Sequence, residues 1–151
     1  MKHLLLAGLL AVGLSGCGSS APTKAVVIDY KKEDNPQALA QFIRSATPAH
    51  RVPIVYFYAD WCGPCRRFRA TLPSEQVDDA LQQAAIIKVN VDSCQDLVAY
   101  YHLTAIPAFV KVDAQGQPLA VITSDKWKED EPAEIAPVME KLVNTAAYDL
   151  K

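Results

Sequence analysis

The chain has 151 residues, of which 15 are basic and 17 are acidic, so its formal net charge at pH 7 is −2. This length is enough for one compact domain with a hydrophobic core and too short for two. The chain contains no sustained run of Lys and Arg, which argues against nucleic acid as a partner. We therefore expect a single folded domain that does not bind nucleic acid.

The first sixteen residues have the pattern of an export signal. Met1-Lys2-His3 is a short, weakly basic start, and an apolar run follows from Leu4 to Leu14. This run is too short to span a bilayer as a stable helix, so residues 1–16 are predicted to be a cleaved signal peptide. Leu14-Ser15-Gly16-Cys17 also resembles the bacterial lipobox, which predicts a lipid on Cys17. The alternative is an ordinary secretory signal with a chance cysteine.

Residues 17–24 are predicted to be the lipidated N-terminus and a polar linker, because this stretch has no apolar periodicity. Residues 25–151 then form the folded domain. At about 3.3–3.6 Å per residue, the linker keeps the domain within roughly 25 Å of the membrane surface. The expected location is the periplasmic side of a bacterial membrane. Gly18, rather than Asp, follows the cysteine, which favours the outer membrane if the source is Gram-negative.

The rest of the chain has strand and helix patterns in the order βαβαβαββα, in which the two helical stretches on either side of Pro73 count as one. Short runs of apolar residues predict strands at 25–30, 53–58, 86–91, 108–112 and 119–123. Helices are predicted at 36–46, at 66–72, from residue 74 or 75 to 84, at 96–101 and from a start between residues 132 and 137 onward. Pro73 ends or bends the second helix. The turn at residues 113–116 predicts a hairpin between the last two strands.

Trp61-Cys62-Gly63-Pro64-Cys65 lies between a predicted buried strand and a predicted helix. Two thiols three residues apart can close into a small disulfide ring and reopen with little backbone movement. At the start of a helix, unpaired amides and the positive dipole end favour a thiolate on the first cysteine and can depress its pKa to roughly 3.5–7.5. The pattern therefore predicts a redox switch at Cys62 and Cys65.

Other uses of this cysteine pair fit the sequence less well. A zinc site needs four ligands, but the remaining candidates Cys94, His50 and His102 lack finger-like spacing. Covalent haem attachment needs His directly after the second cysteine, and Arg66 stands there. A structural disulfide usually joins distant segments, because a very short loop constrains little chain entropy. Neither a metal nor another cofactor is expected.

From about Ala25 to the C-terminus the chain resembles the thioredoxin family. The motif at residues 61–65 matches that family's active-site motif, and Thr104-Ala105-Ile106-Pro107 matches the loop that carries its cis-proline. Residues 57–62 are also similar to the periplasmic C-terminal domain of the transmembrane reductant conduit of Gram-negative bacteria. The resemblance implies an α/β fold of the thioredoxin type, in which helices flank a central mixed β-sheet.

The resemblance also implies roles for the two cysteines, with Cys62 as the exposed attacking thiol and Cys65 as the buried resolving thiol. Cys62 would form a mixed disulfide with a target, and Cys65 would then attack Cys62 and release the reduced target. The expected function is therefore that of a lipid-anchored thiol:disulfide oxidoreductase that reduces protein disulfides and is recharged by a membrane-embedded reductant donor. The alternative is a binding module or copper chaperone, because thiolates suit Cu(I).

The remaining motif residues receive roles from the same resemblance. Pro107 would face the cysteines and hold the substrate strand. The Ile106-Pro107 bond is expected to be cis, a form seen in about 5–6% of such bonds, and an ordinary trans turn is the alternative. Trp61 belongs to the motif, while Gly63 permits close approach of a target. The pairing of Gly63 with Pro64 is associated with reducing members of the family.

Three positions depart from the family pattern or stand outside it. Tyr56 replaces the buried Asp usually found six residues before the first cysteine, so slow resolution by Cys65 is expected. We predict that Tyr56 is a packed core aromatic. Lys88 matches a strand lysine of the family and is predicted to reach solvent. Cys94 is interpreted as a packed free thiol, with an accessory redox or dimerising cysteine as the alternative.

Overall fold

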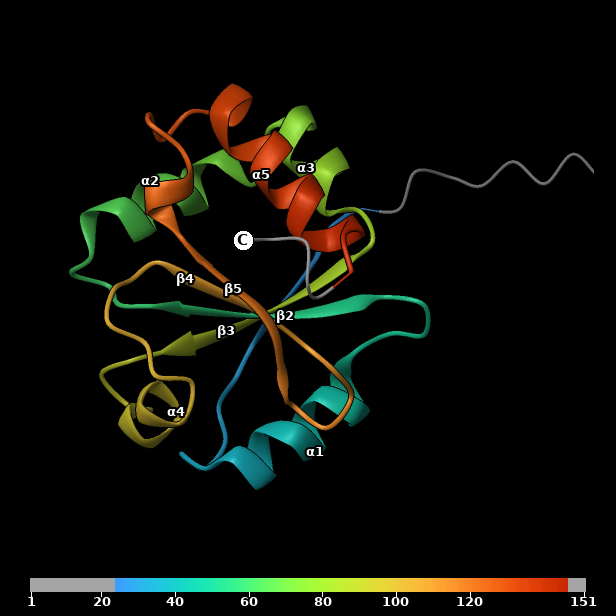
Figure 1. The fold of residues 1–151 in the computed structure, drawn as a ribbon, viewed down its shortest axis with the longest axis vertical. Helices are drawn as coiled ribbons and strands as arrows, with labels where there is room; N and C mark the ends of the chain where they lie inside the picture. The colour runs from blue at the N-terminus through green and yellow to red at the C-terminus, as the bar shows by residue number, and fades with distance from the viewer. Residues whose placement is uncertain (1–23, 147–151) are drawn as a thin grey trace, which may run out of the picture.

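The computed structural model describes residues 24–146, in which two layers of helices enclose a five-stranded sheet (Figure 1). The strands are β1 (Val26–Asp29), β2 (Val52–Tyr58), β3 (Ala84–Asn90), β4 (Ala108–Val112) and β5 (Pro118–Thr123). The helices are α1 (Pro36–Ala46), α2 (Gly63–Thr71), α3 (Glu75–Leu81), α4 (Gln95–Tyr100) and α5 (Pro132–Asn144). The predicted order of elements is confirmed, with bounds that differ by a few residues. A short 3-10 helix at Ser124–Lys126 is an addition.

The sheet is mixed, with the strand order β1-β3-β2-β4-β5. The strands β1, β3 and β2 run parallel, and β4 runs antiparallel to both β2 and β5. Tyr58 pairs in register with Asn90, and Phe57 pairs with Ala108. The ends of β2 and β3 and the start of β4 therefore meet at one edge of the sheet, which is where the cysteine motif and the proline loop lie.

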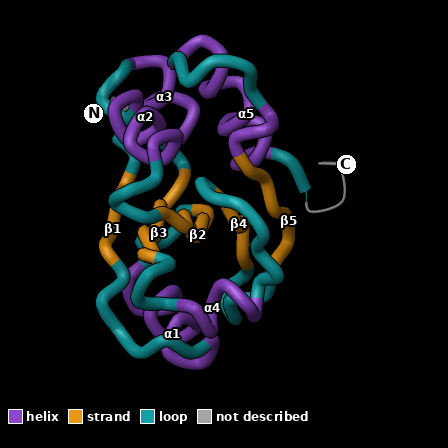
Figure 2. Tube along the Cα trace, turned by 90° about the vertical axis from the view of Figure 1, so that its left-hand side faces the viewer, coloured by secondary structure: helices purple, strands orange, loops and turns teal. Residues whose placement is uncertain are grey.

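Successive residues of β2 point to opposite faces of the sheet and enter two separate cores. Ile54 and Tyr56 pack on the side of α2, α3 and α5, whereas Val55 and Phe57 pack on the side of α1 and α4. Figure 2 shows these two helical layers above and below the strands. All four side chains are fully buried. Burial on both faces explains why the sequence of β2 is an uninterrupted apolar run.

Local capping defines the starts of two of the helices. Asn35 accepts a hydrogen bond from the Ala38 amide at 2.8 Å and begins α1. Ser74 accepts one from the Val77 amide at 3.4 Å and begins α3. Because α2 ends at Thr71 and Pro73 cannot continue a helix, the chain turns there as predicted.

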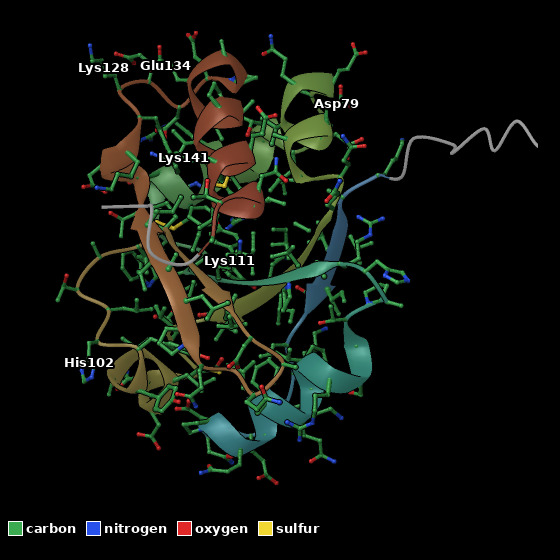
Figure 3. All side chains as sticks on the ribbon, turned by 45° about the vertical axis from the view of Figure 1, so that its right-hand side comes forward. Asp79, His102, Lys111, Lys128, Glu134 and Lys141 are labelled. Atoms are coloured by element: carbon green, nitrogen blue, oxygen red, sulfur yellow. A yellow bond between two sulfur atoms is a disulfide. The ribbon has the colours of Figure 1, made fainter. Side chains whose placement is uncertain are left out.

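The C-terminal end of α5 is tied to the sheet by Lys111 of β4. Its ammonium donates to the carbonyl oxygens of Val143 and Thr145 at 2.9 and 2.8 Å. A cation at this end of a helix meets carbonyls that lack partners within the helix. Figure 3 shows Lys111 directed toward this end of α5. Burial lowers the pKa of Lys111, yet these contacts give its charge direct partners.

The predicted signal peptide at residues 1–16 and the predicted lipidation site Cys17 lie outside the described residues. Between residues 24 and 146, no helix has the length and apolar character needed to cross a membrane.

Candidate active site

The two motif cysteines lie where β2 gives way to α2. Cys62 is the residue that caps the N-terminus of α2, and its sulfur accepts a hydrogen bond from the Cys65 amide at 3.2 Å. The two sulfurs form a disulfide with an S–S distance of 2.06 Å and a Cα–Cα distance of 5.3 Å. A sulfur at this position faces the unpaired amides of the first helical turn, so a thiolate formed there is stabilised.

Both cysteines are buried in the disulfide form. Cys62 is 4% exposed and Cys65 is fully buried. The expectation of an exposed Cys62 is therefore wrong for this state, because Ala59, Tyr58 and Ile106 pack around the disulfide. The two cysteines differ only slightly in exposure, and Cys62 is the more exposed of the two. A target must therefore reach a sulfur-bearing residue of which only 4% is exposed.

The proline loop closes the site from the side of β4. The Ile106–Pro107 peptide bond is cis, as the resemblance implies. Pro107 is buried, and Ile106 is half-buried against the disulfide. The carbonyl oxygen of Ile106 lies 3.9 Å from the sulfur of Cys62. A thiol on Cys62 can donate to this oxygen after reduction, so the loop is in position to touch the reacting sulfur.

The other motif residues shape the outer surface of the site. Trp61 is 67% exposed, and its indole N–H donates to both carboxylate oxygens of Asp92 at 3.1 and 3.2 Å. Pro64 stands in the first turn of α2, where an amide would have no partner within the helix. A Cβ at Gly63 would lie 3.3 Å from a guanidinium nitrogen of Arg67, so a side chain there would require that arginine to shift.

Tyr56 lies next to Cys65. Its ring is fully buried and contacts Phe109 and Phe68 at centroid distances of 4.9 and 5.1 Å. The prediction of a packed core aromatic is confirmed. The Tyr56 hydroxyl donates to the carbonyl oxygen of Cys65 at 3.1 Å. Burial raises the pKa of Tyr56 to about 12, so the phenol stays neutral and is not a base for the Cys65 thiol.

Two cations lie over the ring of Tyr58 at the inner side of the site. Lys88 Nζ is 5.2 Å and Arg69 Cζ is 5.0 Å from the ring centroid. The ammonium of Lys88 also pairs with Asp29 at 2.9 Å. Lys88 reaches solvent as predicted, with its side chain 20% exposed, and Asp29 on the neighbouring parallel strand adds a carboxylate that was not foreseen. Sequence reasoning did not single out Arg69, although its i+4 spacing from Cys65 was a usable signal.

Cys94 is 3% exposed and packs in the core beneath α1 and α4. Burial raises the pKa of its thiol. These facts favour a packed free thiol over a dimerising cysteine. His102 follows α4 and is exposed, and Figure 3 shows it at the outside of the molecule beside that helix. Among residues 24–146, no three His, Cys, Asp or Glu side chains are grouped to hold a metal ion.

Known proteins are similar to this chain in sequence. The family model described as Thioredoxin matches residues 30–136, which is more than half of the chain. The chain belongs to the thioredoxin family. A thioredoxin-like protein of Fusarium culmorum is 34% identical over 93 residues, which cover 59% of this chain and 74% of that protein.

Other thioredoxin relatives align over shorter stretches. Thioredoxin-T of Drosophila melanogaster is 35% identical over 60 residues, 40% of this chain and 38% of that protein. The chain spans only 11% of the peptide-N(4)-(N-acetyl-beta-glucosaminyl)asparagine amidase of Caenorhabditis elegans, to which it is 37% identical over 68 residues. This chain therefore covers less than half of these two relatives.

Solved thioredoxins show the same fold. The thioredoxin of Trichomonas vaginalis superposes with a TM-score of 0.51 at 29% identity, covering 77% of this chain and 96% of that one. The thioredoxin NaTrxh of Nicotiana alata superposes with a TM-score of 0.55 at 20% identity, covering 84% of this chain and all of that one. The chain is thus a thioredoxin-like domain with a Cys62–Cys65 disulfide at its site.

Proposed function

We propose that this chain is a thiol:disulfide oxidoreductase that reduces disulfide bonds in proteins. The observation that supports this most strongly is the Cys62–Cys65 disulfide at the N-terminus of α2, with the Cys65 amide 3.2 Å from the Cys62 sulfur. After reduction, that amide and the helix dipole favour a thiolate on Cys62. The thiolate is the attacking species in thiol–disulfide exchange, so Cys62 is assigned as the nucleophile.

The exchange runs in two steps that balance in electrons and protons. First, the Cys62 thiolate attacks one sulfur of a client disulfide, a bond forms between Cys62 and the client, and the released client sulfur takes a proton. Second, the Cys65 thiolate attacks the Cys62 sulfur, the mixed disulfide breaks, and the second client sulfur leaves and is protonated. The client gains two electrons and two protons, and Cys62 and Cys65 are left as the disulfide.

The surface beside Cys62 suits an extended client segment. Trp61, next to Cys62 in the chain, is exposed, and the half-buried Ile106 packs against the disulfide. We assign this surface to client docking. The clients are proteins that carry a disulfide, and a membrane-embedded donor of reducing equivalents is assigned to reopen the Cys62–Cys65 bond.

We further propose that a lipid on Cys17 holds the domain on the periplasmic side of a bacterial membrane, the outer membrane if the source is Gram-negative. The lipobox-like sequence before Cys17 and the apolar run from Leu4 to Leu14 support this. Mass spectrometry of the mature N-terminus is the test, and acylated Cys17 is the expected result. Cys17→Ser is expected to abolish membrane partitioning. A mature N-terminus at any other residue would contradict the anchor.

The reductase activity is tested with insulin disulfides as the client and glutathione as the reductant. Wild type and Cys94→Ser, the matched control, are expected to turn over, whereas Cys62→Ser and Cys65→Ser are not. Only Cys65→Ser is expected to accumulate a mixed disulfide on non-reducing gels, because it can attack but not resolve. Trapping by Cys62→Ser alone would reverse the roles. Stoichiometric Cu(I) binding under competition, without insulin reduction, would favour the copper-chaperone alternative.

A further inference from the structure

The exchange mechanism leaves one charged side chain at the site without a role. Arg69 stands one turn after Cys65 on α2, so the two side chains share a face of the helix. The adjacent Arg66 and Arg67 are exposed, whereas Arg69 is half-buried. Arg67 is neutralised by Asp130, to which it forms a salt bridge of 2.5 Å. Among these three arginines of α2, Arg69 is the one directed inward.

An aromatic ring links the guanidinium of Arg69 to the disulfide. Arg69 Cζ lies 5.0 Å from the centroid of the Tyr58 ring, which is within the range of a cation–π interaction. Tyr58 packs in turn against the buried cluster formed by Ala59, Cys62 and Cys65. The half-buried positive charge of Arg69 therefore lies against the ring that packs on the Cys62–Cys65 cluster.

Arg69 has no neutralising carboxylate in the part of the chain that the structure describes. Its Nη1 is buried without a hydrogen-bond partner, and none of the ion pairs within residues 24–146 includes it. A charge that is partly buried and has no carboxylate beside it is costly, even with the neutral Tyr56 hydroxyl as a neighbour. This cost is reduced in any state of the protein in which an anion forms near Arg69. Reduction of the disulfide creates such an anion when Cys65 ionises.

The other ionisable groups around Cys65 do not supply a base. On β2, Tyr56 and Tyr58 are phenols, and burial raises the pKa of Tyr56 to about 12, a rise that the Arg69 guanidinium opposes. On β3, Lys88 is a cation, and the carboxylate of Asp29 on β1 is engaged by it at 2.9 Å. The surroundings of Cys65 therefore offer positive charge rather than a proton acceptor.

We propose that Arg69 is a positioning residue of the redox site, whose half-buried positive charge stabilises the Cys65 thiolate needed to resolve the mixed disulfide. This deepens the proposed reductase function and rests on it. When the resolving step begins, Cys65 releases its proton to solvent, and the charge of Arg69 lowers the free energy of the thiolate that remains. Electrostatic stabilisation of the Cys65 thiolate thus takes the place of proton transfer from Cys65 to a buried carboxylate.

The test is the ionisation of Cys65 in the reduced protein, followed by NMR of [3-13C]cysteine-labelled chains, with Cys65→Ser used to assign the signal. Arg69→Gln is expected to move the midpoint to higher pH, so that the thiolate fraction at a pH below the midpoint falls about tenfold or more, as expected on losing a nearby opposite charge. Arg69→Lys, which keeps the charge, is expected to restore most of the effect. Arg67→Gln, the matched control, is expected to leave the midpoint unchanged.

The inference is overturned if Cys65 ionises at the same midpoint pH in Arg69→Gln as in the wild type. It is also overturned if Arg67→Gln shifts this midpoint as far as Arg69→Gln does. Backbone amide spectra check folding, and Arg69→Met, which keeps the apolar length, replaces Arg69→Gln if the latter unfolds. The titration needs no client protein. A wild type that fails to reduce insulin would therefore remove the proposed function, whereas an unchanged midpoint in an active enzyme would remove only the role of Arg69.

Discussion

At the residue scale, Tyr56 changes what lies beneath the resolving cysteine. Its hydroxyl donates to the Cys65 carbonyl at 3.1 Å, and its ring fills the core between Phe68 and Phe109. A carboxylate at this position would accept the Cys65 proton, whereas the phenol does not. Tyr56 is therefore a structural support for the start of α2, and the ionisation of Cys65 depends on other groups.

Removing the Tyr56 hydroxyl tests this support. Tyr56→Phe is expected to lower the free energy of unfolding by about 1 kcal/mol, because a buried hydrogen bond is lost while the ring packing stays. Tyr100→Phe is the matched control, since the Tyr100 hydroxyl accepts an exposed hydrogen bond from Gln117; its effect is expected within about 0.5 kcal/mol. Urea denaturation of the oxidised proteins measures both. Equal losses in the two variants would contradict the supporting role.

Restoring an acid at this position is expected to have two opposite effects. Tyr56→Asp removes a fully buried ring, so the free energy of unfolding is expected to fall by about 3–5 kcal/mol. In protein that remains folded, the carboxylate accepts the Cys65 proton and the resolving step is expected to speed up at neutral pH. Stopped-flow kinetics of mixed-disulfide breakdown measures this rate. Unchanged resolution in a folded variant would show that deprotonation of Cys65 is not limiting.

At the element scale, the segment after β5 that contains Trp127 and Asp130 packs against α2. Trp127 is 7% exposed and packs against Phe68 of α2. Its indole N–H donates to Asp130 at 2.8 Å, and Asp130 also accepts from Arg67 of α2 at 2.5 Å. One carboxylate therefore joins the segment to the helix that carries the cysteines.

This carboxylate gives the fold a specific sensitivity to acid. Burial raises the pKa of Asp130, but the bonds from Trp127 and Arg67 outweigh it and leave the pKa below its usual value. The stability it contributes is present above the unfolded pKa of about 3.9 and is lost as the pH falls through the lower folded pKa. Asp130→Asn is therefore expected to lose less stability than wild type between pH 5 and pH 2.

Urea midpoints measured across this pH range test the expectation, and the two proteins should converge at the acidic end. Asp79→Asn serves as the matched control, because Asp79 is an exposed residue of α3 with no ion pair within residues 24–146 (Figure 3). It is expected to retain the wild-type acid dependence. A wild-type dependence in Asp130→Asn as well would show that the contact contributes nothing to the stability.

At the scale of the whole molecule, the direction of electron flow is linked to the stability of the two redox forms. A fold that stabilises its disulfide form relative to its dithiol form makes the pair a better reductant, and the reverse makes it an oxidant. If the chain is a reductase, its oxidised form is expected to unfold at a higher urea concentration than its reduced form. A more stable reduced form would contradict the reductase assignment. Each 1.4 kcal/mol of difference in stability between the two forms corresponds to a shift of about 30 mV in the reduction potential.

The sequence was sufficient for most of the fold because its signals are local. The strand β4 was predicted with its observed bounds, Ala108–Val112, since Pro107 and the hairpin turn mark its two ends. The start of α2 was placed too late, because its first turn is built from the motif itself. Arg69 was not singled out from the sequence. Its i+4 spacing from Cys65 was a signal, but packing decides which of the three arginines of α2 turns inward.

The contrast between the two tryptophans supplies built-in optical probes. Trp61 is 67% exposed beside the disulfide, whereas Trp127 is 7% exposed in the core. An exposed indole fluoresces at longer wavelength than a buried one, and a disulfide next to an indole quenches it. The long-wavelength emission of Trp61 should therefore increase when the Cys62–Cys65 disulfide is reduced. The shorter-wavelength emission of Trp127 should change only when the protein unfolds. Trp61→Phe and Trp127→Phe separate the two signals, so a single sample reports both its redox state and its folding.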